Sequence, residues 1–533
     1  MLPTLRTKAR VAAPVPERVD VAIVGAGLGG LMTAARLAKA GKRVAVLDRH
    51  YVAGGCATMF ARGPAEQRFV FDVGLHYVGE CGPGERLSRL LDDVGVNLEW
   101  RRLDDDGFDE LIFPDFRFRV PANLELYRER LLAMFPAEKR GIDRYVRLLG
   151  EVRVLGRPDA PRGWKLAFEA LTQGRLAASN RGSTLATFLD SCIQDPKLRA
   201  VIAGQNGDYG LPPTKVSLML HAGLANHYFG GAYYPKGGGQ VIADGLCDKI
   251  EALGGTIHLR HAVEQILVEG GRVTGLRYQG AHGESGVLHA PTVVAAGDLK
   301  RTILELLPEA SVPAVEREKA VAWEMGGALY LLALAVRTDL GKLGMGATNY
   351  WQFDSYDFDT MYGEINTTPD VPPVRGCYIT SATRKDLGTP GHCPAGIETV
   401  EVMALVPGDT AKWRVALKDA ESTRYRAALD YRELKDRVEA NLIARLEGLF
   451  PGSTRDIVYR EGASPVTQTR FTGSSGGTSY GLAATPDQFL ANRPGYRGFI
   501  PGLFFAGANT RAGHGIVGAL ASGGHAARAV MKG

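Results

Sequence analysis

The sequence predicts an α/β protein in which a Rossmann domain is assembled from three separated chain segments, with an inserted α+β substrate domain. Three observations predict this class: a strand–glycine turn–helix–strand unit near the N-terminus, a second helix-and-strand block bounded by glycines, and a strand and helix at the C-terminal end. The expected Rossmann segments are residues 19–99, 231–300 and 461–533, and the expected substrate domain comprises residues 100–230 and 301–460.

The first unit begins with an apolar strand over residues 19–24, which a run of glycines ends. A helix rich in Ala and Leu follows over residues 31–40, and Gly41 stands where a helix commonly ends on glycine. Residues 43–48 then read as a buried parallel strand. Strand, helix and strand together indicate a βαβ unit.

The later blocks return to this pattern. Ile242, Leu246, Ile250 and Leu253 share one face of a helix that Gly254-Gly255 ends. The turn Glu269-Gly270-Gly271-Arg272 predicts a hairpin, and residues 293–297 and 503–507 read as buried strands, the latter followed by a helix over 515–531. Between these blocks, residues 100–230 look mostly helical and irregular, and residues 301–460 look mixed and aromatic-rich.

Composition limits the class of protein. The chain has 533 residues and a mass of 57.3 kDa, so at least two structural domains are expected. A net charge of +5 gives no general case for nucleic-acid binding. Mean hydropathy is −0.08, and the six cysteines do not have the spacing of a metal site or a disulfide framework. Neither a cleaved signal nor a membrane span is expected. These observations favour a cytoplasmic protein that could bind a membrane surface peripherally.

The glycine run has the spacing GxGxxG between a strand and a helix. In this motif one glycine makes a tight turn, the next lets the backbone approach a pyrophosphate, and the third lets helix and strand pack closely, while the helix N-terminus faces negative charge. Asp48 ends the next strand, where a carboxylate binds ribose hydroxyls. The pattern predicts a dinucleotide site.

Four further features favour FAD in a glutathione-reductase-like arrangement. They are a glycine loop after Asp48, a strand around Val263 beside the adenine, small residues ending the 293–297 strand, and a C-terminal helix whose positive end would face the flavin. The expected cofactor-binding residues are Gly25, Gly27, Leu28, Gly29, Gly30, Asp48, Arg49, Gly54, Gly55, Cys56, Ala57, Val263, Ala296, Gly297, Gly507, His514, Gly515, Ile516 and Val517. No metal site is expected.

Several motifs resemble the superfamily of phytoene desaturases, carotenoid isomerases and retinol saturases, most closely the retinol saturases. The resemblance covers roughly residues 19 to 531, and it departs from the saturase pattern at His514. The motifs are Gly54-Gly55-Cys56-Ala57, Phe71-Asp72-Val73-Gly74-Leu75-His76-Tyr77-Val78-Gly79, Ala225-Asn226-His227-Tyr228, Tyr234-Pro235-Lys236-Gly237-Gly238, Thr348-Asn349-Tyr350-Trp351, Ser464-Pro465-Val466-Thr467 and Tyr480-Gly481.

The resemblance implies an FAD-dependent oxidoreductase acting on carbon–carbon double bonds of a long apolar polyene or isoprenoid lipid. Retinol-saturase-like reduction is the first choice, and desaturation or flavin-dependent cis–trans isomerisation are alternatives. NAD(P)H, a quinone or a separate reductase could exchange electrons with the flavin. From a different class, an escort protein with the architecture of GDP-dissociation inhibitors would bind prenyl lipids without flavin chemistry, and the intact glycine and carboxylate motifs argue against it.

Hydride transfer at a flavin leaves one proton to be managed, so an acid near the ring is expected. His76 and Tyr77 lie in the segment that the resemblance places beside the flavin, and His227 is in a second His-Tyr pair. Each could equally be a packed side chain with a satisfied polar tip. Cys56 lacks a partner cysteine in sequence and is interpreted as a packing residue.

Two segments suggest how a lipid is bound. The aromatic run 350–358 could line a polyene tunnel or form an ordinary core strand. Residues 153–181 interleave basic residues with Trp164 and Phe168, a composition that suits either a helix on an anionic membrane or a solvated basic face.

Overall fold

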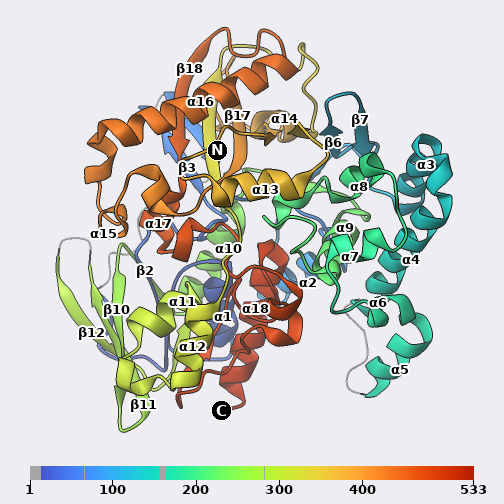
Figure 1. Cartoon of the computed structure of the whole chain (residues 1–533). Coiled ribbons are helices and arrows are strands. Elements are labelled where there is room, and N and C mark those ends of the chain that lie inside the picture. The colour runs from blue at the N-terminus through green and yellow to red at the C-terminus, as the bar shows by residue number, and fades with distance from the viewer. Residues whose placement is uncertain (1–13, 65–66, 157–163, 281–282) are drawn as a thin grey trace.

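A computed structural model describes residues 14–533 except 65–66, 157–163 and 281–282. Its first layer is a parallel five-stranded sheet of order β19-β13-β1-β2-β9, shown in the lower half of Figure 1. The strands come from three distant parts of the chain: β1 Val21–Val24, β2 Val44–Asp48, β9 Thr256–Leu259, β13 Val293–Ala295 and β19 Leu503–Phe505.

Alternate side chains of these strands enter two different cores, because successive residues of a strand face opposite sides of the sheet. Val21 and Ile23 pack with the helices α1 Leu28–Lys39, α10 Gln240–Ala252 and α18 Gly515–Met531. Ala22 and Val24 pack with the antiparallel sheet β10 Ala262–Glu269, β11 Arg272–Gln279 and β12 Ser285–His289. The Rossmann architecture and the predicted hairpin at Gly270-Gly271 are thereby confirmed.

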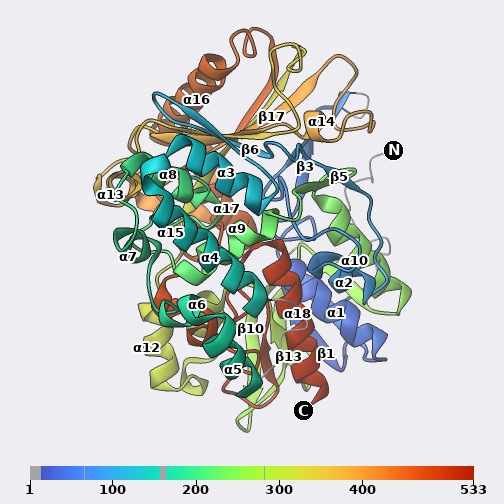
Figure 2. The same cartoon turned by 90° about the vertical axis from the view of Figure 1, so that its right-hand side faces the viewer.

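A second, seven-stranded sheet of order β18-β14-β17-β16-β15-β6-β7 lies above the first in Figures 1 and 2. Helix α16 Leu429–Leu449 packs on it, with Leu442 and Leu446 in the shared core. Only the β6–β15 pair is parallel. The strands are β6 Asp109–Ile112, β7 Arg117–Val120, β14 Ala328–Val336, β15 Asn349–Phe353, β16 Gly376–Thr380, β17 Glu398–Val406 and β18 Ile457–Ala463.

The expectation that residues 100–230 are mostly helical needs correction at its beginning. β5 Trp100–Arg102, β6 and β7 are strands there, and β6 and β7 complete the edge of the seven-stranded sheet. Helices follow and form the flank that faces the viewer in Figure 2. They are α3 Leu124–Met134, α4 Lys139–Leu155, α5 Trp164–Gln173, α6 Arg175–Ser179, α7 Leu185–Asp190, α8 Pro196–Ala203 and α9 Leu218–Tyr228.

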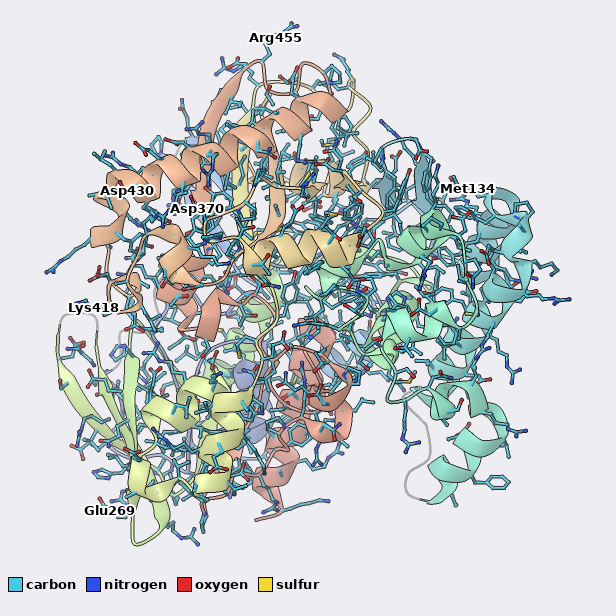
Figure 3. All side chains as sticks on the ribbon, in the orientation of Figure 1. Met134, Glu269, Asp370, Lys418, Asp430 and Arg455 are labelled. Atoms are coloured by element: carbon cyan, nitrogen blue, oxygen red, sulfur yellow. The ribbon has the colours of Figure 1, made fainter. Side chains whose placement is uncertain are left out.

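Short elements join the layers. The hairpin of β3 Met59–Arg62 and β4 Phe69–Asp72 contacts β17, and β5 pairs with β8 Tyr233–Pro235. The remaining helices are α2 Arg86–Asp92, α11 Leu299–Arg301, α12 Ala314–Ala322, α13 Phe358–Thr367, α14 Ala382–Lys385, α15 Leu417–Ala420 and α17 Pro465–Thr472. Glu269 and Arg455 lie at opposite ends of the molecule (Figure 3).

Within the described residues, no helix has both the length and the apolar character needed to cross a membrane.

Candidate functional site

A cavity of about 1570 Å³ is lined by residues of both large sheets, including Val24 and Leu47 on one side and Leu331 and Met403 on the other. Of the residues expected from the sequence to bind the cofactor or act in catalysis, all except Gly30 line it. Gly30 lies beneath the turn, where a Cβ would collide with the Gly25 carbonyl oxygen and lie 3.1 Å from Ala296 Cβ. Its role is therefore close packing of helix on strand.

The other glycines of the turn have different structural roles. Gly25 has φ +104°, a conformation that side chains disfavour. A Cβ on Gly29 would lie 2.7 Å from Gly507 Cα, so α1 and the segment after β19 can approach only without side chains there. At Gly27 the nearest atom to a Cβ is Gly55 Cα at 4.0 Å. The protein thus leaves space at the start of α1, as a pyrophosphate would need.

Asp48 lies at the end of β2 and at the wall of the cavity. Its Oδ2 accepts a hydrogen bond from the Ala26 amide at 2.6 Å, and its Oδ1 accepts one from the His50 amide at 2.7 Å. These bonds fix the carboxylate while leaving a second lone pair on each oxygen. The carboxylate is therefore positioned to accept further hydrogen bonds from ribose hydroxyls.

The glycine loop after β2 runs beside the start of α1. The Gly54 amide donates to the Ala26 carbonyl at 2.7 Å, and Gly54 and Gly55 both have positive φ. Cys56 receives a hydrogen bond from Gln468 Nε2 at 3.1 Å, and burial raises the pKa of its thiol. A neutral thiol in this position packs rather than reacts.

The C-terminal helix α18 opens onto the same cavity. His514 is its N-cap residue but makes no capping hydrogen bond through its side chain. Burial lowers the His514 pKa to about 3, and its Nδ1 has no hydrogen-bond partner among the described residues. A neutral, unpartnered imidazole nitrogen at a positive helix end suits a polar ring such as a flavin.

Beside β10 and the end of β13 the cavity is lined by Val263, Ala296 and Gly297. There Glu421 bridges Arg49 and Arg301. Burial opposes ionisation of Glu421, but hydrogen bonds from both arginines outweigh it and lower its pKa to about 2. This pair of ion contacts ties the β2 end to the segment after α15.

The three side chains expected to act in catalysis differ in how many hydrogen-bond partners they have within the described residues. His76 is buried at the wall, its pKa is lowered to about 3 by burial and by Lys385, and its Nε2 has no partner among the described residues. His227 is occupied: its Nε2 accepts from the Gly79 amide at 2.7 Å and its Nδ1 faces Glu80 Oε2 at 3.4 Å. The Tyr77 hydroxyl contacts two carboxyl groups, Asp208 and Asp109.

Behind His76 lies a buried ionic network that the sequence did not suggest. Lys385 Nζ donates to the His76 carbonyl at 2.5 Å, and burial lowers the Lys385 pKa to about 8. Burial and Asp72 raise the pKa of Glu401 to about 8. No sequence signal marks this cluster, because Lys385 and Glu401 approach Asp72 only through the packing of α14 on β17 and of β17 on β4.

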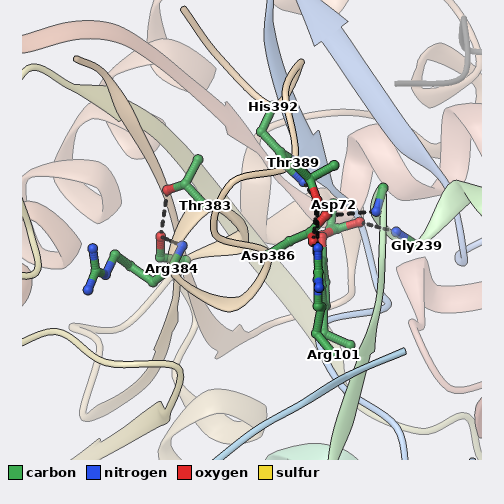
Figure 4. A network of polar contacts seen from close by, with 11 residues as sticks. Asp72, Arg101, Gly239, Thr383, Arg384, Asp386, Thr389 and His392 are labelled. Atoms are coloured by element: carbon green, nitrogen blue, oxygen red, sulfur yellow. Dashed lines mark hydrogen bonds and ion pairs between the residues drawn. The ribbon is translucent and has the colours of Figure 1, made fainter. Parts of the chain in front are cut away.

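Asp72 and Asp386 hold the glycine turn before α10 (Figure 4). Asp72 Oδ1 accepts from the Gly239 amide at 2.8 Å, and Asp386 Oδ2 accepts from the Gly237 amide at 2.8 Å. Asp386 also receives hydrogen bonds from Arg101 and Thr389, and His392 lies 3.0 Å from it. The turn Gly237 to Gly239, which follows strand β8, is therefore fixed by two buried carboxylates.

The rest of the cavity is aromatic and aliphatic. The run 350–358 begins in strand β15 and reaches the first residue of α13, which confirms a strand over its first part. Trp351 and Phe353 lie in the sheet and also line the cavity, and a polyene tunnel there stays a prediction. Leu155, Ala177 and Leu224 extend the lining to α4, α6 and α9. No group of three or more His, Cys, Asp or Glu that could hold a metal occurs within the described part of the chain.

The basic segment 153–181 forms the end of α4, then α5 and α6, and Arg162 lies outside the described residues. Lys165 and Phe168 on α5 are exposed, Phe168 by 63% of its surface. Ala170, Ala177 and Arg181 from the same segment line the cavity. The segment thus contains both exposed side chains and residues of the cavity wall.

Comparison with known proteins gives sequence relatives over most of the chain. The family described as an NAD(P)-binding Rossmann-like domain matches residues 23–94. An all-trans-retinol 13,14-reductase of Danio rerio is 29% identical over 497 residues, covering 88% of this chain and 79% of that protein. A chloroplastic prolycopene isomerase of Daucus carota is 24% identical over 536 residues, covering 95% and 78%. The resemblance to retinol saturases and carotenoid isomerases is confirmed.

Solved structures with the same fold include an oxidoreductase from Methanosarcina mazei, with a TM-score of 0.61, 18% identity and coverage of 96% of this chain and 100% of that one. A putrescine oxidase bound to putrescine gives a TM-score of 0.60 at 16% identity, covering 97% and 99%. The expected fold class is thereby confirmed.

Proposed function

We propose that this chain, a homologue of the all-trans-retinol 13,14-reductases and the prolycopene isomerases, is an FAD-dependent oxidoreductase that reduces a carbon–carbon double bond of a long apolar polyene or isoprenoid lipid. One observation carries the proposal: a single cavity joins the glycine turn and Asp48 to an aromatic and aliphatic wall. Its volume of about 1570 Å³ exceeds that of an ordinary small-molecule pocket and suits a cofactor together with a substrate.

FAD is the proposed cofactor. The space at Gly27 would take the pyrophosphate, Asp48 the ribose, and the start of α18 with His514 one edge of the flavin. When bound, a reduced flavin supplies a hydride. The other cofactor-binding assignments made from the sequence belong to the same proposal.

The polyene would lie along the aromatic wall. Tyr228 stacks on Tyr77 with ring centroids 4.6 Å apart, and Trp351 meets Tyr378 edge to face at 4.6 Å. Such rigid apolar surfaces bind a flat, conjugated chain with little loss of side-chain entropy. His76, with a free nitrogen at this wall, orients the chain or the flavin in this proposal.

We further propose that the lipid enters at a membrane surface through the α4–α6 region. Exposed Phe168 and Lys165 supply shallow insertion and attraction to anionic headgroups, and residues from the same segment line the cavity. This proposal favours a cytoplasmic location, with reversible docking of the protein on a membrane.

The test is anaerobic incubation of the chemically reduced, FAD-loaded protein with retinoids, carotenoids and unsaturated fatty acids. Reduction of the substrate reoxidises the flavin and yields a product with two more hydrogens. A desaturase would instead bleach oxidised flavin, and an isomerase would give a product of unchanged mass. A purified protein that is colourless and refuses added FAD would overturn the proposal in favour of a lipid escort.

The electron donor is tested in the same preparation. NADPH, NADH and a reduced quinone are each added to the oxidised protein, and bleaching of the flavin identifies the class that reacts directly. Failure of all three points to a separate reductase.

A further inference from the structure

The Tyr77 hydroxyl lies between two carboxyl groups. Its oxygen is 2.7 Å from Asp208 Oδ2 and 3.1 Å from Asp109 Oδ2. Tyr77 and Asp109 are buried and Asp208 is half-buried. Tyr77 and Asp208 line the cavity, whereas Asp109 is not among the lining residues. Asp208 was not among the residues expected from the sequence.

Counting protons indicates that one carboxyl group is protonated if both contacts of the Tyr77 hydroxyl are hydrogen bonds. A tyrosine hydroxyl has one hydrogen, so it donates to only one of two carboxyl groups. The second short contact is a hydrogen bond only if that other carboxyl group carries a proton and donates it to the tyrosine oxygen. Two carboxylates around one hydroxyl would otherwise repel each other in a medium of low polarity.

The remaining partners identify which group carries the proton. Asp109 accepts from Gln205 Nε2 at 2.7 Å and from Asn349 Nδ2 at 2.9 Å. Amide donors stabilise the charged form of a carboxyl group. Asp208 has no such donors within the described hydrogen bonds, which leaves Tyr77 as its partner. Burial raises the pKa of Asp109 to about 6, whereas burial together with Asp109 raises that of Asp208 well above its usual value.

The surroundings hold Asp208 rigidly. It ends a short 3₁₀ helix, η3 Asn206–Asp208, whose Asn206 donates to the Ala203 carbonyl at 3.0 Å and accepts from the Tyr362 hydroxyl at 2.9 Å. Tyr77 is stacked on Tyr228. The acid therefore faces the cavity from a fixed position on its aromatic wall.

We propose that Asp208 is the proton donor of the reduction, with Tyr77 and Asp109 as the groups that stabilise it before and after transfer. The inference rests on the proposed function. In this reduction Asp208 would give its proton to one carbon of the double bond, and a bound reduced flavin would supply the hydride for the other carbon. The Tyr77 hydroxyl then turns its hydrogen from Asp109 to the new Asp208 carboxylate, and solvent restores the proton once the product leaves.

The other polar groups of the wall are less suited to this step. His76 is neutral because burial and Lys385 lower its pKa to about 3, so it holds no proton to give at neutral pH. His227 is fixed by Gly79 and Glu80. Unlike these two histidines, Asp208 combines a proton, access to the cavity and a partner for its charged form.

Infrared spectroscopy of the FAD-loaded protein tests the proton directly. The wild-type minus Asp208→Asn difference spectrum should contain the carbonyl band of a protonated carboxylic acid, and Tyr77→Phe should shift that band because its hydrogen bond is lost. Glu401→Gln, which removes a different buried acid with a raised pKa, should remove a separate band and serves as control. Absence of a band assignable to Asp208 overturns the inference.

Kinetics then test the role of the proton. Asp208→Asn should slow substrate-dependent flavin reoxidation by about 10²- to 10⁴-fold, with unchanged FAD content and substrate affinity, and Asp208→Glu should restore part of the rate. A wild-type rate in Asp208→Asn overturns the inference. If wild-type protein reduces no polyene although the Asp208 band is present, the proposed function is wrong, and proton transfer from Asp208 to the substrate is wrong with it. The protonated state of Asp208 would still be supported by the band.

Discussion

Two glycines in the turn after β1, Gly27 and Gly29, have different roles: Gly29 is needed for folding, and Gly27 for the proposed cofactor binding. A side chain at Gly29 would meet the Gly507 backbone at 2.7 Å, so Gly29→Ala should disturb the packing of α1 against the segment after β19. At Gly27, the nearest protein atom lies 4.0 Å from an added Cβ. The same motif therefore contains one position needed by the fold and one needed by the ligand.

Gly27→Val is expected to fold but to retain no flavin, because its methyl groups would fill the space proposed for the pyrophosphate. Flavin absorbance per protein and the thermal midpoint of the flavin-free form measure the two effects. Gly150→Ala is the control: a Cβ added at this glycine of α4 would meet no atom within 4 Å beyond its own stretch of helix, so the variant should keep its flavin. A yellow, fully loaded Gly27→Val protein would show that the site is misplaced.

Helices α4 and α9 are joined by a buried histidine. His221 Nε2 lies 2.8 Å from the Tyr145 hydroxyl, and its Nδ1 lies 3.3 Å from the Tyr209 hydroxyl. Burial lowers the His221 pKa to about 3. In the unfolded chain His221 therefore takes up a proton near pH 6.5, whereas in the folded chain it stays neutral at that pH. The contribution of neutral His221 to the free energy of unfolding is complete above pH 6.5 and is lost as the pH falls.

His221→Gln should consequently become more stable relative to wild type as the pH falls. Between pH 7.5 and pH 5.0 the difference in the free energy of unfolding should move by about 2 kcal/mol in favour of the variant. Urea unfolding at both pH values measures it. His221→Asn also cannot titrate, so its free energy of unfolding relative to wild type should change with pH as much as that of His221→Gln, even if the two variants differ in absolute stability. Different pH dependences for the two variants would contradict the assignment to His221.

Helix α5 is the element through which membrane docking is proposed. A Lys165→Glu, Phe168→Ser double variant should lose binding to anionic liposomes at low salt while keeping its flavin, because headgroup attraction and apolar insertion are both removed. Sedimentation with liposomes measures it, and high salt should release the wild-type protein.

Val321→Ser gives a matched control for this test. Val321 on α12 is 60% exposed, close to the 63% of Phe168, but in Figure 1 α12 lies near the middle of the lower half, apart from α5 at the lower right. The control should bind liposomes as wild type does. If wild-type protein ignores anionic liposomes at low ionic strength, α5 is an ordinary solvated helix and the lipid must arrive by another route.

At the scale of the whole molecule, the cavity links the two large sheets, since residues of β1, β2, β14 and β17 all line it. A cofactor held there should stabilise the folded chain as a whole. With free FAD at about 100 times its dissociation constant, the gain is about 2.7 kcal/mol. The thermal midpoint of flavin-depleted protein should rise with added FAD, and that of Gly27→Val should stay constant. An FAD-independent midpoint in wild type would argue against the site.

Much of the Rossmann part was predictable because its signals are local. The apolar runs before Gly25 and before Gly507, the glycine conformations and the helix-ending Gly41 each depend on a few neighbouring residues. Strands β6 and β7 were missed for the same reason. Each is only four residues long and has two charged side chains, and they form strands only by pairing with β15 and with each other.

Amino-acid order was enough to predict the succession of blocks, the glycine turn with Asp48 and the resemblance to polyene-acting flavoenzymes. Only the folded chain shows which polar side chains share a buried space: Tyr77 between Asp109 and Asp208, Lys385 under His76, and the closed contacts of His227. The physical reason is that protonation and hydrogen bonding depend on burial and on neighbours distant in the chain, which no local pattern of residues encodes.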